Sequence, residues 1–204
     1  MLDRAANAAL MPLLQAGARG LVRAGIGADA VTLAGFAIGM AAAVAVAFQS
    51  YALGLVLLLL SRLADGLDGP VARLTQSTDR GAFLDITLDF LFYASIPLAF
   101  AIAEPAANAL PAAVLLAAFI GTGSSFLAFA VLAQKRGIAS SDYPNKGVYY
   151  LGGLAEATET LVCFALMCIW PDKFAWWAYG FAALCALTIG TRIVGGARAL
   201  SGKV

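Results

Sequence analysis

The chain has 204 residues, of which 62% are hydrophobic and only 12% are charged. Soluble globular domains contain roughly 45–50% apolar and about 25% charged residues, so a water-soluble domain of this size could not bury so much apolar surface. The formal net charge of +1 at pH 7 excludes a strong basic field that would attract nucleic acid. The composition therefore predicts an integral membrane protein without a nucleic-acid partner.

The absence of histidine removes several further classes of function. Ser-His-Asp and Cys-His hydrolases are excluded, as are sites that bind zinc or haem through histidine. The three cysteines lie in apolar runs without the spacing of metal ligands. We expect Cys163, Cys168 and Cys185 to be buried, reduced thiols.

Residues 1–27 mix apolar side chains with arginines. We expect them to form an amphipathic segment that lies on the inner leaflet, is broken at Pro12 and ends within 25–27. A cleaved signal peptide is the alternative, but no short apolar region precedes the first long apolar run. The chain is thus divided into a juxtamembrane segment, 1–27, and a membrane domain, 28–204.

The gaps between charged residues predict six transmembrane helices. A crossing takes about 20 apolar residues, so the charge-free region 30–61 can hold two helices joined by a turn at Gln49 and Ser50. The remaining four helices are expected within 82–103, 108–134, 147–169 and 174–191. Because each crossing must satisfy its own backbone hydrogen bonds and no alternating barrel strands are visible, the predicted fold is all-α.

The two ends of the predicted helices differ in charge. The connections at 49–50, 104–107 and 170–173 are short. If the amino terminus is cytoplasmic, every one of the 13 Lys and Arg residues except Lys173 belongs to the cytoplasmic side. This distribution follows the positive-inside rule. It predicts a multi-pass protein with both termini in the cytoplasm.

Four aspartates occur on two consecutive predicted helices. Asp65 and Asp68 are three residues apart, and Asp85 and Asp89 are four apart, so each pair lies on one face of its helix. We expect the two helices to be antiparallel neighbours whose carboxylates converge. An Asp within a membrane helix costs about 2.5–3.5 kcal/mol, so the group requires cations. Ligation by oxygen alone suits Mg²⁺ or Mn²⁺, and two such ions would balance the four charges.

Ion pairs with Arg62, Arg73 and Arg80 are the alternative explanation for these aspartates. Three arginines could neutralise three of the four charges. However, the aspartates are interleaved with small residues, which let a ligand approach the backbone closely. These small residues are Gly66, Gly69, Ala72 and Gly81. The spacing therefore favours a metal site over ion pairs.

The stretch from Asp65 to Asp89 resembles the signature of the CDP-alcohol phosphotransferase family, D-x-x-D-G-x-x-A-R followed by G-x-x-x-D-x-x-x-D. Every fixed position is matched, and the spacer between Arg73 and Gly81 is one residue shorter than is common in the family. The resemblance implies a membrane transferase of phospholipid biosynthesis, with six transmembrane helices and an amino-terminal interfacial helix. Such an enzyme moves a phosphatidyl group from CDP-diacylglycerol to an alcohol and releases CMP.

The resemblance also implies roles for individual residues. Asp65, Asp68, Asp85 and Asp89 would hold two Mg²⁺ or Mn²⁺ ions over the donor pyrophosphate, and Asp89 would act as general base on the acceptor hydroxyl. Asp29 stands where the family commonly has Asn. The cytidine and phosphate pocket would be lined by Thr32, Gly69, Ala72, Arg73 and Gly81.

The acceptor is less closely defined. Choline and ethanolamine transferases related to the family that this chain resembles use a histidine base, and the absence of histidine here disfavours an aminoalcohol acceptor of that type. Lys146 and Arg192 near the cytoplasmic mouth would favour an acceptor that carries a phosphate, such as glycerol phosphate or inositol phosphate. Glu156 and Glu159, expected on the 147–169 helix, would contact a polyol or a cationic headgroup, or would pair with Arg192 and Lys146.

Two other functions compete with phosphatidyl transfer. A divalent-cation channel or carrier would also use intramembrane carboxylates, but residues 51–60 and 90–98 are almost wholly apolar and offer no conduction path. Intramembrane prenyl transfer also uses Asp-rich motifs, which there lie on distant helices.

Assembly and location rest mainly on the resemblance. The family implies a homodimer, and Gly35 and Gly39 offer a close-packing face for a second subunit or for helices of the same subunit. Residues 121–126 and 152–159 also resemble a bacterial inner-membrane branch of the family. The resemblance therefore implies a bacterial inner-membrane protein.

Overall fold

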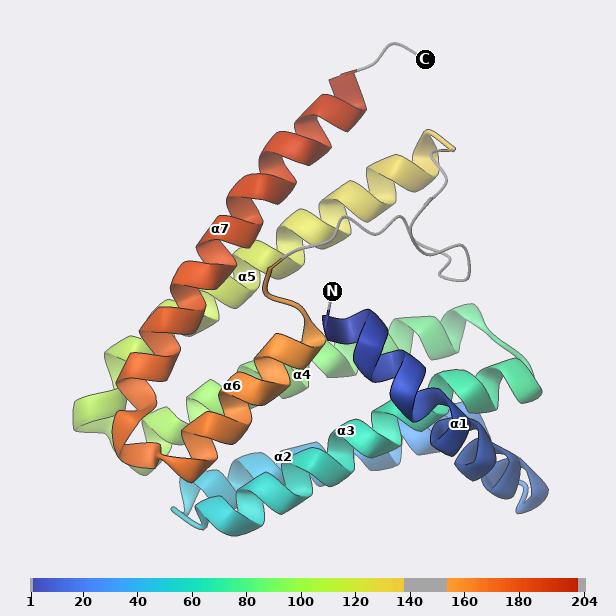
Figure 1. The fold of residues 1–204 in the computed structure, drawn as a ribbon, viewed down its shortest axis with the longest axis horizontal. Helices are drawn as coiled ribbons and strands as arrows, with labels where there is room; N and C mark the ends of the chain where they lie inside the picture. Colours follow the sequence, from blue (N-terminus) through green and yellow to red (C-terminus); the bar gives the residue numbers. More distant parts are fainter. Residues whose placement is uncertain (1, 138–153, 202–204) are drawn as a thin grey trace.

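The computed structural model describes residues 2–137 and 154–201, and all regular secondary structure within these ranges is helical (Figure 1). In chain order the elements are α1 (Leu2–Arg23), α2 (Ala28–Ala47), α3 (Tyr51–Leu74), α4 (Asp79–Ala103), α5 (Pro105–Lys135), α6 (Ala157–Ile169), the short 3-10 helix η1 (Pro171–Lys173) and α7 (Phe174–Ser201). The predicted all-α fold is confirmed for the described residues.

Four regions of the described chain are long and apolar enough to cross a membrane: α2, α4, α5, and η1 together with α7. The helix α3 has 24 residues, but its second half carries Arg62, Asp65, Asp68 and Arg73. The helix α6 is apolar and has only 13 residues. The six predicted crossings thus correspond to α2–α7, of which four meet the length and composition of a span.

The helix α1 continues through Pro12, so the predicted break at this residue is wrong. A proline removes one backbone hydrogen bond, and packing can hold the rest of the helix in place. Here Leu14 and Ala18 are buried where α1 packs against α3. The helix ends as predicted, because Gly25 adopts a positive φ of 75° and Ile26 N–H donates to the Leu21 carbonyl.

The helices α2 and α3 form a closely packed antiparallel pair. The turn between them contains Gln49 with φ 61°, and its side-chain amide donates to the carbonyl of Ala103 at the end of α4 (2.9 Å). A Cβ on Gly39 would lie 2.6 Å from the ring of Phe92, and one on Gly35 would lie 3.2 Å from the Cβ of Ala64. The two glycines therefore serve packing within the subunit.

An aromatic core joins α4, α6 and α7. The rings of Phe100 and Phe174 stack with centroids 4.7 Å apart, and Phe92 meets Phe164 edge to face at 6.4 Å. All four of these rings are fully buried. We use the name aromatic core for Phe92, Phe100, Phe164 and Phe174. The three cysteines are buried and free, as predicted.

The connection between α4 and α5 is shorter than the predicted 104–107, since Glu104 alone separates the two helices. Pro105 begins α5, which suits the first position of a helix because its missing N–H has no helical partner there. Asn108 then ties the turn together by donating to the carbonyl of Phe100 at 3.1 Å.

The predicted helix 147–169 begins only at Ala157 among the described residues, so its placement of Glu156 inside a helix is wrong. Glu156 is the N-cap, and it forms a reciprocal capping box with Glu159. The backbone N–H groups of Leu154 and Ala155 donate to the hydroxyl of Thr188 on α7, at 3.1 and 3.0 Å. These contacts replace the helical hydrogen bonds that the apolar sequence led us to expect.

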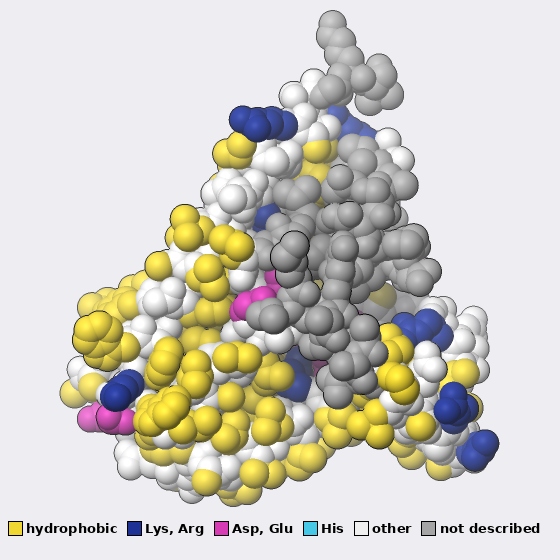
Figure 2. Space-filling model, viewed as in Figure 1, with side chains coloured by type: hydrophobic (Ala, Val, Ile, Leu, Met, Phe, Trp, Pro, Cys, Tyr) yellow, Lys and Arg dark blue, Asp and Glu magenta, His cyan; other side chains and the backbone are white. Residues whose placement is uncertain are grey.

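The connections α2–α3, α4–α5 and α6–α7 all lie at one end of the molecule, at the lower left of Figure 1. Hydrophobic side chains cover much of this end in Figure 2, whereas most of the visible Lys and Arg side chains lie at the upper and right edges. The arrangement agrees with the predicted division of charge between the two ends of the helices.

Candidate active site

Four aspartates gather between α3 and α4. Both helices pack against α2, which brings the charged end of α3 opposite the first turns of α4. One carboxylate oxygen from each of Asp65, Asp68 and Asp85 lies within 4.8 Å of the others, and all three side chains are half-buried. Asp89 lies one turn further along α4, and Arg62 links it to Asp65 because its guanidinium pairs with both carboxylates. We call these four residues the aspartate group.

Thr32 on α2 holds one member of the aspartate group. Its hydroxyl lies 2.7 Å from Oδ2 of Asp68 and 3.1 Å from the carbonyl of Ala28, and the residue is 7% exposed. The family resemblance predicts that Thr32 lies near the nucleotide. In the structure its direct partner is a carboxylate, so Thr32 fixes the orientation of Asp68.

Arg62 connects Asp65 and Asp89. Its Nη1 donates to Oδ1 of Asp89 at 2.7 Å and lies 3.4 Å from Oδ2 of Asp65, while its side chain is only 11% exposed. The guanidinium carbon lies 3.9 Å from the centre of the Phe92 ring. Of the predicted competing ion pairs, this one is formed. Arg80 pairs instead with Asp29, at 3.5 Å.

The small residues of the motif have different neighbours. Gly81 lies where α4 passes α2, since a Cβ there would be 3.2 Å from Oδ1 of Asp29. Gly69 faces the guanidinium of Arg73, whose side chain is exposed. A Cβ on Gly66 would meet Leu14 of α1 at 3.5 Å, so this glycine accommodates α1 beside the aspartate group.

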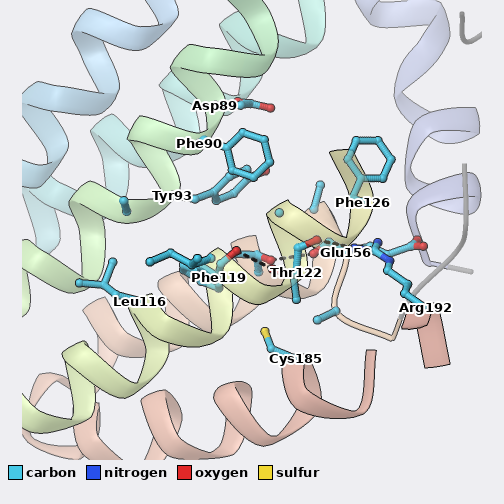
Figure 3. Close-up of a pocket in the computed structure, with 16 residues that line it drawn as sticks. Asp89, Phe90, Tyr93, Leu116, Phe119, Thr122, Phe126, Glu156, Cys185 and Arg192 are labelled. Atoms are coloured by element: carbon cyan, nitrogen blue, oxygen red, sulfur yellow. Dashed lines mark hydrogen bonds between the residues drawn. The ribbon is translucent and has the colours of Figure 1, made fainter. Parts of the chain in front are cut away.

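A cavity of about 550 Å³ begins at Asp89 and extends between α4, α5, the start of α6 and α7 (Figure 3). Its walls are mostly apolar and include Tyr93 and Phe119. Tyr93 was not among the predicted site residues, although it follows Asp89 by four residues and so shares its helix face. The polar lining comes chiefly from Asp89, Glu156 and Arg192.

The predicted acceptor residues are only partly brought together. Arg192 and Glu156 both line the cavity, and Arg192 donates to the carbonyl of Thr122 at 3.1 Å while its guanidinium carbon lies 5.7 Å from the Phe126 ring. Glu159 is outside the lining and accepts from the backbone N–H of Glu156 at 3.3 Å. Lys146 lies outside the described residues.

Comparison with known proteins agrees with this geometry. The sequence model of the CDP-alcohol phosphatidyltransferase family matches residues 26–190, which is well over half of the chain. The chain belongs to this family. Over 196 residues it is 53% identical to the inner membrane protein YnjF of Escherichia coli, a match that covers 96% of this chain and 95% of that protein.

Solved structures that resemble the fold include those of the phosphatidylinositol phosphate synthase PgsA1 of Mycobacterium tuberculosis. The form with CDP-DAG bound has a TM-score of 0.72 and 21% identity, and the match covers 91% of this chain and 94% of that one. The form with manganese and citrate has a TM-score of 0.69 and 20% identity, with 90% and 88% covered. At this identity the likeness establishes a shared fold.

The oxygens of the aspartate group can be compared with the ligand spacing of a hard divalent cation. Mg²⁺ binds oxygen at about 2.0–2.1 Å, so ligands in its octahedral site are about 3.0 Å apart when adjacent and about 4.2 Å apart when opposite. The oxygens of Asp65, Asp68 and Asp85 lie within 4.8 Å of one another, and side-chain rotations would bring them to this spacing. The residues therefore fit one such ion, while Asp89 is engaged by Arg62.

Proposed function

We propose that the protein transfers a phosphatidyl group from CDP-diacylglycerol, or a related CDP-linked lipid, to an alcohol and releases CMP. The observation that carries this proposal is the convergence of Asp65, Asp68 and Asp85 beside a cavity that begins at Asp89. Membership of the family supports the reaction class. The similar fold of a synthase with CDP-DAG bound supports the nature of the donor.

The aspartate group would hold Mg²⁺ or Mn²⁺, and Thr32 would keep Asp68 turned toward the ion. The bound ions would neutralise the donor pyrophosphate and the departing CMP. Arg73 and Gly81 border the connection between α3 and α4, where they would meet the nucleotide together with Gly69 and Ala72.

Asp89 is suited to remove the proton from the acceptor. It lines the cavity, so an alcohol that enters there would meet its carboxylate. Oδ1 of Asp89 accepts from Arg62, which leaves Oδ2 as the oxygen that would take the proton. Arg192 and Glu156 would contact the polar part of the acceptor, and the apolar wall would exclude water from the reacting atoms.

The same proposal includes an orientation in the membrane. The helices α2–α7, within the domain 28–204, would cross the bilayer, and residues 1–27 would lie on the inner leaflet. The aspartate group and both termini would then face the cytoplasm, opposite the short turns. A homodimer in the bacterial inner membrane completes this arrangement, in keeping with the inner-membrane relative.

The test is an acceptor screen with purified protein in micelles that contain radiolabelled CDP-diacylglycerol and Mn²⁺ or Mg²⁺. We expect divalent-dependent CMP release and a labelled lipid product with one acceptor class. Asp68→Asn should abolish both signals, whereas Asp172→Asn, in η1 at the opposite end, should leave them unchanged. Full activity of the Asp68 variant would remove the assigned role.

The channel alternative is tested by ion uptake into liposomes. Buried Leu58, Ile96 and Phe100 fill the interior between the aspartate group and the short turns. Such packing leaves no polar path among the described residues, so we expect no Mn²⁺ uptake above that of protein-free liposomes.

A further inference from the structure

Arg62 is a buried cation placed inside a site that is otherwise built from carboxylates. One turn before Asp65 on α3, it makes its short hydrogen bond to Asp89 on α4 (2.7 Å) and lies 3.4 Å from Asp65. It therefore spans the aspartate group from one helix to the other. The family motif begins at Asp65, so this arginine lies outside its fixed positions.

The surroundings of Arg62 hold it in place. Its guanidinium lies over the Phe92 ring at 3.9 Å, and Nη2 lies 3.4 Å from the hydroxyl oxygen of Ser61, which is itself fully buried. The Tyr93 ring centre is 5.7 Å away on the same side of α4. To leave Asp89, the side chain would have to give up its contact with the aromatic core. Arg62 is thus a fixed charge, in contrast to Arg80, whose side chain is 76% exposed.

The charge balance changes when this fixed cation is counted. Four carboxylates need two divalent cations for neutrality only if no other cation is present. With Arg62 in place, one divalent ion already leaves a single uncompensated negative charge, and a second would make the site positive. Repulsion between a divalent ion and a guanidinium is strong where both are partly shielded from water.

The positions of the aspartates agree with this balance. The three that converge on a possible ion, Asp65, Asp68 and Asp85, leave out Asp89. Asp89 is the member that Arg62 binds at the shorter distance. Oδ1 of Asp89 already accepts a hydrogen bond from the guanidinium of Arg62, so a second ion at Asp89 would lie close to this positive charge.

We propose that Arg62 acts as a built-in cation that keeps the second divalent position empty until the donor arrives. In the absence of nucleotide the protein binds one Mn²⁺ or Mg²⁺, at Asp65, Asp68 and Asp85. The pyrophosphate of the donor brings negative charge and oxygen ligands, and a second ion then binds with it. This inference rests on the proposed function, because it assumes that the aspartate group binds divalent metal.

The proposal is tested by counting bound Mn²⁺ in the purified full-length protein, by calorimetry and by electron paramagnetic resonance of free Mn²⁺. We expect one ion per chain without nucleotide and two in the presence of saturating CDP, which is not consumed. Two ions without CDP would overturn the inference and leave the proposed reaction standing. No bound Mn²⁺ under either condition would overturn both.

Two variants separate the charge of Arg62 from its general effect. Arg62→Gln removes the charge and should raise the number of Mn²⁺ ions bound without CDP from one to two. Arg80→Gln makes the same change of net charge at an arginine that pairs with Asp29 outside the group, and it should still bind one. A single ion in Arg62→Gln would contradict the inference. If that variant does not fold, the change from one ion to two on adding CDP to the unaltered protein remains the deciding result.

Discussion

The aromatic core and the aspartate group meet on α4, yet they are built in opposite ways. In the aromatic core all four rings are fully buried, with Phe100 stacked on Phe174 and Phe92 edge to face with Phe164. In the aspartate group the carboxylates are half-buried, and Thr32 holds Asp68 while Arg62 holds Asp89. The aromatic core is filled by its own side chains, whereas the oxygens of Asp65, Asp68 and Asp85 converge on one another in the aspartate group.

This difference indicates how one sequence serves both stability and chemistry. The aromatic core fixes α4 against α6 and α7, through the pairs Phe92–Phe164 and Phe100–Phe174. The helix α4 can then carry Asp85 and Asp89 beside the charged half of α3. Arg62 joins the two regions, because it lies over Phe92 and bonds to Asp89. Substitutions in the two regions should therefore separate loss of activity from loss of stability.

The largest effect on activity is expected from Asp68→Asn. The amide cannot supply the negative charge that a divalent ion requires, and metal-ion catalysis contributes several kcal/mol, so CMP release should fall by about a thousandfold. The melting temperature in detergent should change little, because Asp68 contributes no core packing. The measurement is CMP release alongside a thermal melt, and a variant that unfolds instead would show that Asp68 is mainly structural.

The largest effect on stability is expected from Phe100→Ala. This ring is fully buried and stacks on Phe174 at 4.7 Å and on Tyr51 at 5.6 Å. Its removal should lower the free energy of unfolding by about 3–5 kcal/mol. The folded fraction should keep most of its specific activity at low temperature. If Phe100→Ala and Asp68→Asn lose equal activity, the aromatic core and the aspartate group do not separate stability from activity.

A smaller effect is expected from Thr32→Val, which keeps the shape of the side chain and removes the hydroxyl that bonds to Asp68. Residues that orient a metal ligand typically contribute 10–100-fold to metal affinity or activity. We expect the Mn²⁺ concentration for half-maximal activity to rise by about tenfold. Thr32→Ser should restore most of the affinity, and a Val variant with unchanged Mn²⁺ dependence would show that the hydroxyl is dispensable.

The smallest of these effects is expected from Gly39→Ala. Its new Cβ would lie 2.6 Å from the Phe92 ring and 2.8 Å from Ser61 Oγ, so the helices must shift. Overpacking of this kind costs about 1–3 kcal/mol. A lower melting temperature with an unchanged oligomeric state would support packing inside the subunit. Loss of a dimer without loss of monomer stability would instead assign Gly39 to a subunit interface.

The sequence alone predicted the helical fold and the position of the aspartate group well, because both depend on local spacing. Charge gaps located most of the helices, and the spacings Asp65–Asp68 and Asp85–Asp89 placed each pair on one face of its helix. The end of α1 was also readable, since Gly25 supplies the positive φ that closes the helix.

Features that depend on distant contacts were not readable from spacing. The start of α6 at Ala157 is set partly by Thr188, more than 30 residues away, which accepts from two backbone N–H groups. Pro12 was expected to break a helix that packing against α3 keeps continuous. The arginine that pairs with the aspartates could not be selected from Arg62, Arg73 and Arg80, because the choice depends on which one lies over Phe92.

The central claim is that carboxylates from α3 and α4 share a divalent cation. The most direct measurement is the anomalous scattering of manganese in crystals grown in lipid and soaked with Mn²⁺. We predict a strong peak between Asp65, Asp68 and Asp85, with Arg62 still bound to Asp89 when nucleotide is absent. Crystals with no peak there, or with these carboxylates turned away from one another toward arginines, would contradict the account.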